Sequence, residues 1–159
     1  MTQEPRTTLD STDIALLDRL QRDGTATAQD LGEALNLSAS QAGRRRQRLE
    51  ENGTIKGYSA RIDPDRIGLH VQAFVQVSLA RHGSEHGPGF TRLLRTRPEI
   101  TSAWTMTGEA DYLLRVWCPD LPALNRLIHE VLLAHPSVSR VQSQIVMDQP
   151  KLDGPLPVA

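Results

Sequence analysis

Hydrophobic residues in the first third of the chain recur at helical spacing in three short runs. The three inner stripes are Ile14, Leu17 and Leu20, then Leu31, Ala34 and Leu35, then Ala42 and Leu49. Each run follows an N-cap residue with a capping-box partner three positions later, and the pairs are Asp10 with Asp13, Thr27 with Asp30, and Ser38 with Gln41. The sequence therefore predicts three capped helices, with Gly24 ending the first and Gly53 ending the third.

The second and third predicted helices are separated only by about Asn36 and Leu37, so the chain must turn sharply between them. A helix, a tight turn and a cation-bearing helix form a helix-turn-helix, which places its second helix in a DNA major groove. The outward side of the third helix carries Ser40, Gln41, Arg44, Gln47 and Arg48. Arginine and glutamine there suit base edges, whereas Ser38, Ser40 and neighbouring arginines such as Arg45 suit phosphates. The alternative is that the third helix is an ordinary solvated helix with basic residues. The capped helix and the short turn that precede it favour DNA binding instead.

The segment after Gly53 is rich in residues that favour β structure. Residues 54–62 are predicted to form a strand or wing beside the DNA-binding helices, from which Lys56 and Arg61 would reach phosphate. Asp63-Pro64-Asp65 and Gly68 then mark an interdomain hinge.

The rest of the chain alternates strand and helix patterns. Every odd position from Leu69 to Leu79 is apolar, which marks a strand with one buried face. A loop at 83–89, a short helix around Phe90 to Leu94, strands at 100–106 and 112–118, a helix capped by Asp120 and a last strand at 137–147 follow in order. This β-α-β-β-α-β order predicts a ferredoxin-like antiparallel sheet with two helices on one face, so the fold class is α+β. A partner subunit is the simplest cover for the other face, and at least a dimer is expected.

The charge is unevenly placed along a chain whose net charge is −1. Residues 38–61 hold six cations against two carboxylates, and that local surplus is what a phosphate backbone would meet. The apolar fraction of 38% fits a folded soluble protein, and no run approaches the roughly 20 apolar residues of a membrane span. A polar start without a signal-peptide core and a single cysteine, Cys118, suit the cytoplasm. No cofactor is implied.

One enzyme-like motif stands in the predicted loop. His82-Gly83-Ser84-Glu85-His86 fits the H-x-x-E-H pattern of some zinc peptidases, which need both histidines on one helix face. Gly83 and the run 87–89 favour a solvated loop, so neither a metal site nor an enzyme is expected. Cys118 is interpreted as core or interface rather than nucleophile, and Trp104 and Trp117 as core or dimer contacts.

Several motifs together resemble the Lrp/AsnC, or feast/famine, family of transcriptional regulators from about Leu9 to Met147. They are Leu9-Asp10-x-x-Asp13, Leu37-Ser38-x-Ser40, Arg45-x-x-Arg48-Leu49-Glu50-x-x-Gly53-x-Ile55, Ile62-Asp63-Pro64, Gly68, and Thr107-Gly108-x-x-Asp111-Tyr112-Leu113-Leu114. Their order and spacing follow the family. Two positions depart from it: Arg46 stands where an apolar residue is usual, and Thr25 replaces a frequent arginine.

The resemblance implies a winged helix-turn-helix joined by a hinge to an RAM/Lrp-type ligand-sensing domain. Together with the polar start, the hinge residues and the prolines of the C-terminal segment, it predicts a flexible N-terminus at 1–8, the DNA-binding domain at 9–62, the hinge at 63–69, an effector-binding and oligomerisation domain at 70–148 and a flexible tail at 149–159. It further implies double-stranded operator DNA as partner, homodimers assembling into octamers, an amino-acid effector bound between dimers, and control of amino-acid metabolism or transport genes, including its own.

By the same resemblance, the effector pocket borders the turn formed by Thr107, Gly108, Glu109, Asp111 and Tyr112, with Gln144 reaching a ligand from a neighbouring dimer. Asp111 would accept from an ammonium group and turn amides would receive a carboxylate. The alternative is that Gly108 merely supplies a positive φ for a hairpin and Asp111 bonds the turn. A second rival is a small-molecule-binding protein whose N-terminal domain has lost DNA specificity.

Overall fold

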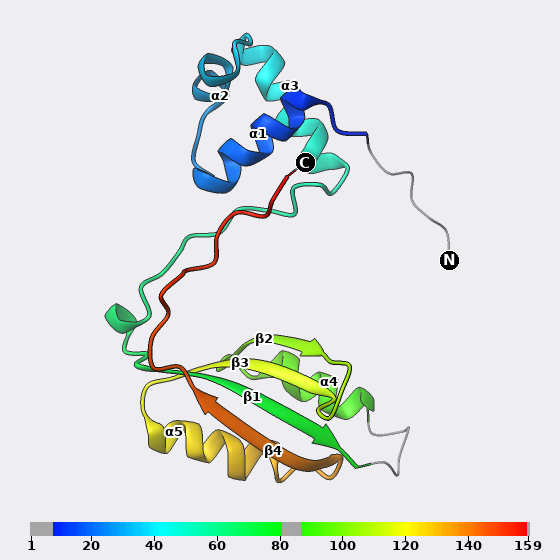
Figure 1. The fold of residues 1–159 in the computed structure, drawn as a ribbon, viewed down its shortest axis with the longest axis vertical. Helices are drawn as coiled ribbons and strands as arrows, with labels where there is room; N and C mark the ends of the chain where they lie inside the picture. The colour runs from blue at the N-terminus through cyan, green and yellow to red at the C-terminus, as the bar shows by residue number, and fades with distance from the viewer. Residues whose placement is uncertain (1–7, 81–86, 159) are drawn as a thin grey trace. The chain divides into compact units, whose positions relative to one another are not determined.

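The computed structural model describes residues 8–80 and 87–158 of the chain (Figure 1). The chain divides into two compact units. Unit 1 contains residues 1–61 together with 151–159, and unit 2 contains residues 62–150. No helix in the described ranges is long and apolar enough to cross a membrane.

Unit 1 is built from three helices, α1 (Ser11–Arg22), α2 (Ala28–Leu35) and α3 (Ala39–Glu51). All three predicted capping boxes are formed, at Asp10, Thr27 and Ser38. Gly53 follows α3 with φ of 75°, as expected of a left-handed terminator. The prediction that Gly24 ends the first helix is wrong, because the C-cap of α1 is Asp23 in an extended conformation and Gly24 does not adopt a positive φ. The local sequence therefore determines where these helices begin.

A small apolar core joins the three helices, and its buried members are Leu16, Leu17, Leu20, Ala26, Leu31, Ala42 and Leu49. The predicted stripes differ from it at three positions, because Ile14 and Leu35 are half-buried and Ala34 is exposed. Asp13 takes the buried place beside Leu16 and Leu17 on α1. A 3.6-residue pattern indicates which face is covered but not how deeply each member of that face is buried.

Residues 54–62, predicted as a strand or wing, run without a strand partner among the described residues. Ile55 donates its backbone N–H to the carbonyl of Leu49, 2.8 Å away, and its side chain packs against the helical core. A β-strand forms only where a neighbouring strand pairs with its backbone N–H and C=O groups. The β-rich composition of this segment does not provide that neighbour.

The C-terminal residues, expected to form a loose tail, bond to unit 1. The Gln21 side chain on α1 accepts from the backbone N–H of Leu156 at 2.6 Å and donates to its carbonyl at 3.1 Å. Val158 packs against the helical core, and Arg61 donates to the carbonyl of Asp153 at 2.9 Å. These residues therefore form part of the surface of unit 1.

Unit 2 begins with a one-turn 3₁₀ helix at Asp65–Ile67 and Gly68 with φ of 79°, within the predicted hinge. Its strands are β1 (Val71–Leu79), β2 (Ile100–Thr105), β3 (Tyr112–Cys118) and β4 (Val138–Ile145). They form one antiparallel sheet in the order β2-β3-β1-β4 (Figure 1). This is the ferredoxin-like arrangement that the sequence predicts.

Two helices cover one face of that sheet. α4 (Gly87–Thr96) begins within the predicted loop and contributes Phe90 and Leu94 to the core. α5 (Leu121–Arg126), capped by Asp120, continues directly into a π-helix at Leu127–Leu132. Ala73, Val75, Val77, Leu114, Val116 and Cys118 face these helices from β1 and β3. The alternation along β1 is the predicted one.

The opposite face of the sheet carries the alternate residues of each strand. Phe74 on β1 pairs with Arg115 on β3, and Trp104 on β2 pairs with Leu113. Trp104 remains 44% exposed. Large apolar side chains on a surface that lacks a cover within the unit indicate a contact face.

Candidate functional site

The turn between α2 and α3 is set by the backbone. Asn36 adopts the left-handed conformation with φ of 54°, and Leu37 donates to the carbonyl of Gly32 at 2.9 Å. A Cβ on Gly32 would lie 2.8 Å from the carbonyl oxygen of Leu37 and 3.2 Å from the nitrogen of Ala39. Only glycine allows the two helices to approach this closely, so Gly32 fixes the start of α3.

α3 presents one polar row to solvent. Ser40, Arg44 and Gln47 are all exposed and lie on one side of the helix at steps of four and three. The side chain of Arg44 makes no hydrogen bond or ion pair with any residue that the structure describes. Gln47 donates to Glu51 at 2.8 Å, a bond on the surface of the same helix. This row is chemically suited to contact a ligand outside the protein.

Two predicted DNA-binding residues near the start of α3 serve its cap. The hydroxyl oxygen of Ser38 accepts from the backbone N–H of Gln41 at 3.2 Å, and the amide oxygen of Gln41 accepts from the Ser38 N–H at 3.0 Å. Ser38 and Gln41 are nevertheless both exposed. Lys56, beyond the helix, is exposed as well.

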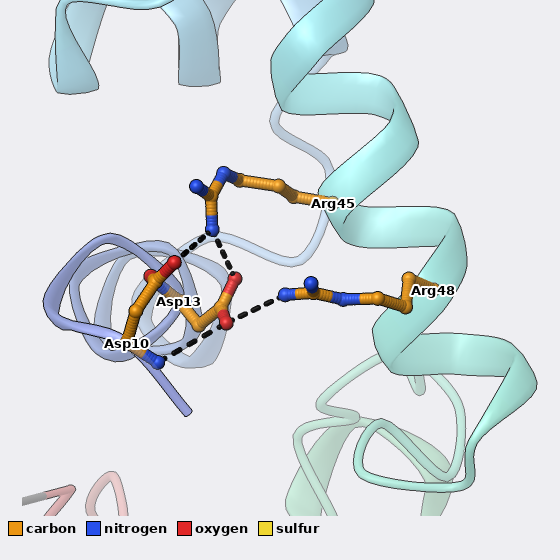
Figure 2. Close-up of polar contacts among 4 residues, drawn as sticks. All are labelled: Asp10, Asp13, Arg45 and Arg48. Carbon is orange, nitrogen blue, oxygen red and sulfur yellow. Dashed lines mark hydrogen bonds and ion pairs between the residues drawn. The ribbon is translucent and has the colours of Figure 1, made fainter. Parts of the chain in front are cut away.

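The other two arginines predicted to contact DNA, Arg45 and Arg48, point toward α1 (Figure 2). Arg45 donates through Nη1 to Asp10 at 2.7 Å and to Asp13 at 2.8 Å. Arg48 donates through Nη2 to the second oxygen of Asp13 at 2.6 Å. The Arg45 hydrogen bond is the main reason that the pKa of Asp10 is lowered. Arg45 and Arg48, both predicted to contact DNA, therefore also link α3 to α1.

Arg46 also has partners within unit 1. Its Nε donates to Glu50 at 2.9 Å, its Nη1 donates to the carbonyl of Ala26 at 3.0 Å, and its guanidinium lies 4.7 Å from the ring centroid of Tyr58. Tyr58 completes the group by donating to the same Glu50 oxygen at 2.9 Å. Arg46, which occupies a usually apolar position, thus links α3 to residue 58 through its length and charge.

The turn between β2 and β3 contains most of the predicted effector residues. Gly108 adopts φ of 130°, a conformation that favours glycine, and no atom lies within 4 Å of the place where a Cβ would stand. The Asp111 carboxylate accepts from the backbone N–H of Leu79 at 2.7 Å, and the Asp111 N–H donates to the carbonyl of Val77 at 3.0 Å. Asp111 therefore holds the turn against β1, which is a structural role that requires no ligand.

The remaining predicted effector residues are spread over both faces of the sheet. Thr107 and Glu109 are exposed in the turn. Tyr112 pairs with buried Val77 and its ring lies 5.2 Å from that of Phe90, on the helix-covered face. Gln144 pairs with Phe74, which precedes the β1 residues that meet the turn.

Three residues that the sequence analysis missed lie beside the turn. Ser78 donates through its hydroxyl to the carbonyl of Glu109 at 3.2 Å, and Arg140 and Gln142 on β4 pair with Ser78 and Gln76. With Glu109 and Ala110 they surround a depression of about 20 Å³. The sheet register brings them together, and the alternation of β4 alone gives no signal for it.

The H-x-x-E-H segment at 82–86 lies outside the described residues. Within the described ranges, no group of three or more His, Cys, Asp or Glu side chains is placed to hold a metal ion. Burial raises the pKa of the Cys118 thiol, as expected for a core cysteine rather than a nucleophile.

Two family models match the chain. The AsnC-type helix-turn-helix domain matches residues 9–50, and the Lrp/AsnC ligand binding domain matches residues 72–156. The first match covers α1, α2 and all of α3 except Glu51, and the second covers the sheet of unit 2 except Val71.

Individual proteins are similar over nearly the full chain. The DNA-binding transcriptional activator DecR of Escherichia coli K12 is 37% identical over 150 residues, which cover 94% of this chain and 99% of that protein. The leucine-responsive regulatory protein of the same organism is 31% identical, with 94% and 91% covered. A crystal structure of a Neisseria meningitidis transcriptional regulator in complex with L-methionine matches with a TM-score of 0.91 at 36% identity, covering 94% of this chain and 97% of that one.

Proposed function

Because this chain belongs to the Lrp/AsnC family of DNA-binding transcriptional regulators, we propose that α3 reads a specific operator and that an amino acid bound at unit 2 changes this binding. The observation that carries the proposal is the exposed row of Ser40, Arg44 and Gln47 on a helix whose entry is fixed by Gly32. The protein is a regulator and not an enzyme.

The chemistry of the row supports base reading. Arg44, whose guanidinium has no partner among the described residues, is suited to bidentate contact with guanine, and Gln47 to adenine. The hydroxyl of Ser40 and the ammonium of Lys56 are suited to phosphate. Arg48, bonded to Asp13 through one nitrogen and 51% exposed, is proposed to position α3 and to contact phosphate with its remaining donors.

The proposed effector site is the depression beside the 107–111 turn. Arg140 would bind the carboxylate of an amino acid, and Glu109 its ammonium group. A volume of about 20 Å³ is close to that of one water molecule, so one chain alone does not enclose an amino acid. We therefore propose that a second subunit completes this site. L-methionine is the first ligand to test, because a regulator of similar fold was solved with it.

The proposed assembly is a dimer through the open face of the sheet, with octamers as the higher state. Phe74, Leu113 and the two tryptophans Trp104 and Trp117 occupy that face and would be removed from water. The targets proposed are genes of amino-acid metabolism or transport, the chain's own gene included, read in the cytoplasm. Sedimentation velocity measures the assembly directly, and a monomer at micromolar concentration would contradict it.

The test of function compares a labelled duplex from upstream of the chain's own gene with a scrambled duplex of the same length. We expect affinity for the upstream duplex at least 10³-fold higher at physiological salt, and we expect L-methionine or another amino acid to change it. Equal affinity for both duplexes would instead support the rival in which the N-terminal domain has lost specificity. Arg140→Ala should lose the amino-acid response, and Arg95→Ala, an exposed arginine on α4, is the matched control.

A further inference from the structure

The chain passes between the two compact units twice. It leaves unit 1 after Arg61 and returns to it after Pro150, so residues 151–159 belong to unit 1 although they follow β4 of unit 2. Two domains joined by one connection reorient freely by default, whereas a second connection that is fixed at both ends removes much of this freedom. Whether the returning passage restrains unit 1 therefore depends on how its ends are held.

The returning passage is held in unit 1 by Gln21 on α1. The Gln21 side chain accepts from the backbone N–H of Leu156 at 2.6 Å and donates to its carbonyl at 3.1 Å, as a neighbouring strand would. Leu156 lies between Pro155 and Pro157, which have no backbone N–H and whose rings fix φ. Because these flanking residues are already stiff, the segment loses little conformational entropy when it docks.

Two further contacts fix the same segment. Val158 packs against the helical core of unit 1, and Arg61 donates through Nη2 to the carbonyl of Asp153 at 2.9 Å. The second contact joins the outgoing passage to the returning one, because Arg61 is the last residue of unit 1 before the first crossing. The outgoing passage is itself bonded to α3, since the Tyr58 hydroxyl donates to Glu50 at 2.9 Å. Both passages are therefore held on unit 1.

In unit 2 the returning passage begins at the end of β4. The backbone N–H of Val146 donates to the carbonyl of Gln72 at 2.9 Å, just beyond the paired residues of β1 and β4. Only residues 147–152 lie between this bond and the bond to the Asp153 carbonyl. Fully extended, this stretch spans at most about 25 Å. A connection this short, held at both ends, limits how far unit 1 can turn relative to unit 2.

Residues 153–158 are docked by hydrogen bonds more than by packing. A hollow of about 830 Å³ lies beside residues 153–155, another of about 380 Å³ lies beside residues 155–158, and Leu156 is 75% exposed. Loose packing gives a segment low local stability. The two bonds from Gln21 therefore supply much of the docking, and their loss should release the segment without unfolding unit 1.

We propose that residues 151–158 are a strap that restrains unit 1 and makes operator recognition selective for the spacing between half-sites. The DNA part rests on the proposed function, in which a dimer presents two α3 helices to one duplex. Both helices reach their half-sites only at a separation and rotational phase that the protein allows, and this phase repeats with the roughly 10–10.5 bp turn of B-DNA.

Releasing the strap leaves only the outgoing passage to orient α3. Gly57 and Gly68 lie on either side of the first crossing, both at positive φ and with no atom of the described residues within 4 Å of the place where a Cβ would stand. Glycine changes its backbone conformation at little steric cost. Without the strap each α3 could therefore adapt to half-sites at other spacings.

The restraint is measured without DNA, by time-resolved fluorescence anisotropy of the full-length protein. A maleimide dye on Ala34→Cys, an exposed position of α2, reports unit 1, and the same dye on Arg95→Cys, exposed on α4, reports unit 2. The native Cys118 is buried and should not react with the dye. In the parent we expect both dyes to follow the slow rotation of the whole protein.

Two variants release the strap, Gln21→Ala and deletion of residues 153–159. In both, the dye on unit 1 should gain a faster component beyond the motion of the dye itself, and the dye on unit 2 should not. Gln21→Glu, which keeps an acceptor for the Leu156 N–H but loses the donor to its carbonyl, should lie between Gln21→Ala and the parent. Gln29→Ala on α2 is the matched control and should match the parent.

The consequence for DNA is measured with the upstream duplex and with versions that carry 5 or 10 extra base pairs at its centre. For the parent we expect the 5-bp insertion, half a helical turn, to lower affinity by at least about 10-fold, and the 10-bp insertion to lower it less. In the two strap variants the 5-bp insertion should cost less than about 3-fold, because α3 can reorient, while affinity for the original duplex should stay within about 3-fold of that of the parent.

The strap is refuted if the dye on unit 1 decays in the deletion variant as it does in the parent. It is also refuted if a parent that binds the upstream duplex specifically tolerates the 5-bp insertion, or if the penalty stays parent-like once the dye shows release. If the parent does not distinguish the upstream duplex from the scrambled one, the proposed function fails instead, and the anisotropy still decides whether residues 151–158 restrain unit 1. Unchanged far-UV circular dichroism excludes loss of the helical fold in the variants.

Discussion

Arg48 on α3 donates a hydrogen bond to Asp13 on α1 at 2.6 Å, although the Asp13 side chain is only 1% exposed and that of Arg48 is 51% exposed. Figure 2 shows this ion pair between the two helices. Arg45 shares the same carboxylate from one turn earlier on α3. The orientation of α3 is thus set by charge as well as by its two buried apolar residues.

Asp13→Ala should destabilise unit 1. It removes the acceptor of two arginines and one half of the α1 capping box. Hydrogen bonds to charged groups contribute about 1.5–3 kcal/mol, and the lower part of that range is expected because both arginines are partly exposed. Denaturant unfolding measures the loss. The control is Asp18→Ala, which removes only an exposed pair with Arg22 and should cost less than about 0.5 kcal/mol. Equal losses in the two variants would contradict the role given to Asp13.

Tyr58 should titrate above its usual pKa near 10. Burial raises this pKa first, and the hydrogen bond to Glu50 raises it further, while Arg46 acts in the opposite direction. A phenol whose folded pKa is raised contributes stability that is complete below the unfolded pKa and is lost as pH rises through the folded pKa. In a Tyr112→Phe background the only remaining tyrosine is Tyr58, so tyrosinate absorbance reports it alone. Glu50→Gln should lower the midpoint, and an unchanged midpoint would contradict the bond.

The C-terminal residues should stabilise the helical unit. Gln21→Ala removes both hydrogen bonds to Leu156, at about 0.5–1.5 kcal/mol each. Deletion from residue 153 onward should have at least the same effect, because it also uncovers the apolar contact of Val158. Amide hydrogen exchange along α1 is the measurement. Gln29→Ala on α2, whose side chain bonds only Glu33 among the residues that the structure describes, is the matched control. Exchange rates that are unchanged by both changes would show that the tail makes no energetic contribution.

Asp111 should act by holding the effector turn. Asp111→Asn keeps an acceptor for the Leu79 N–H and should retain the amino-acid response, whereas Asp111→Ala leaves that N–H without its partner and should weaken the response. The measurement is the amino-acid concentration that half-shifts operator binding. An equal loss in both variants would indicate that the charge of Asp111 contacts the ligand, as first inferred from the family resemblance.

The features predicted from sequence are those that depend on near neighbours. The caps at Asp10, Thr27 and Ser38 act within three residues. Along β1, the alternate apolar positions of the sequence are the ones whose side chains are buried. The partners of Asp13 are 32 and 35 positions away, so its burial is not visible in the α1 pattern. The apolar spacing of Leu124, Leu127 and Val131 suits an α-helix and hides the π-helix.

The same distinction applies to the candidate site. Helical spacing was enough to predict that Arg44 faces outward, because a capped helix fixes direction locally. It was not enough to separate Arg44 from Arg45 and Arg48, whose partners are acids on another helix. Arg140 and Ser78 meet beside the effector turn only through the β1–β4 register, which depends on long-range pairing.

The central claim, that α3 reads DNA through its exposed row, is tested most directly by the affinity of Arg44→Ala for the upstream duplex over a range of salt concentrations. Because Arg44 has no partner among the described residues, its loss should leave the Tm unchanged while specific affinity falls by about 1–3 kcal/mol, and the affinity for scrambled DNA should change much less. Arg95→Ala on α4 should bind as the parent does. Parent-like affinity and specificity in Arg44→Ala would contradict the account.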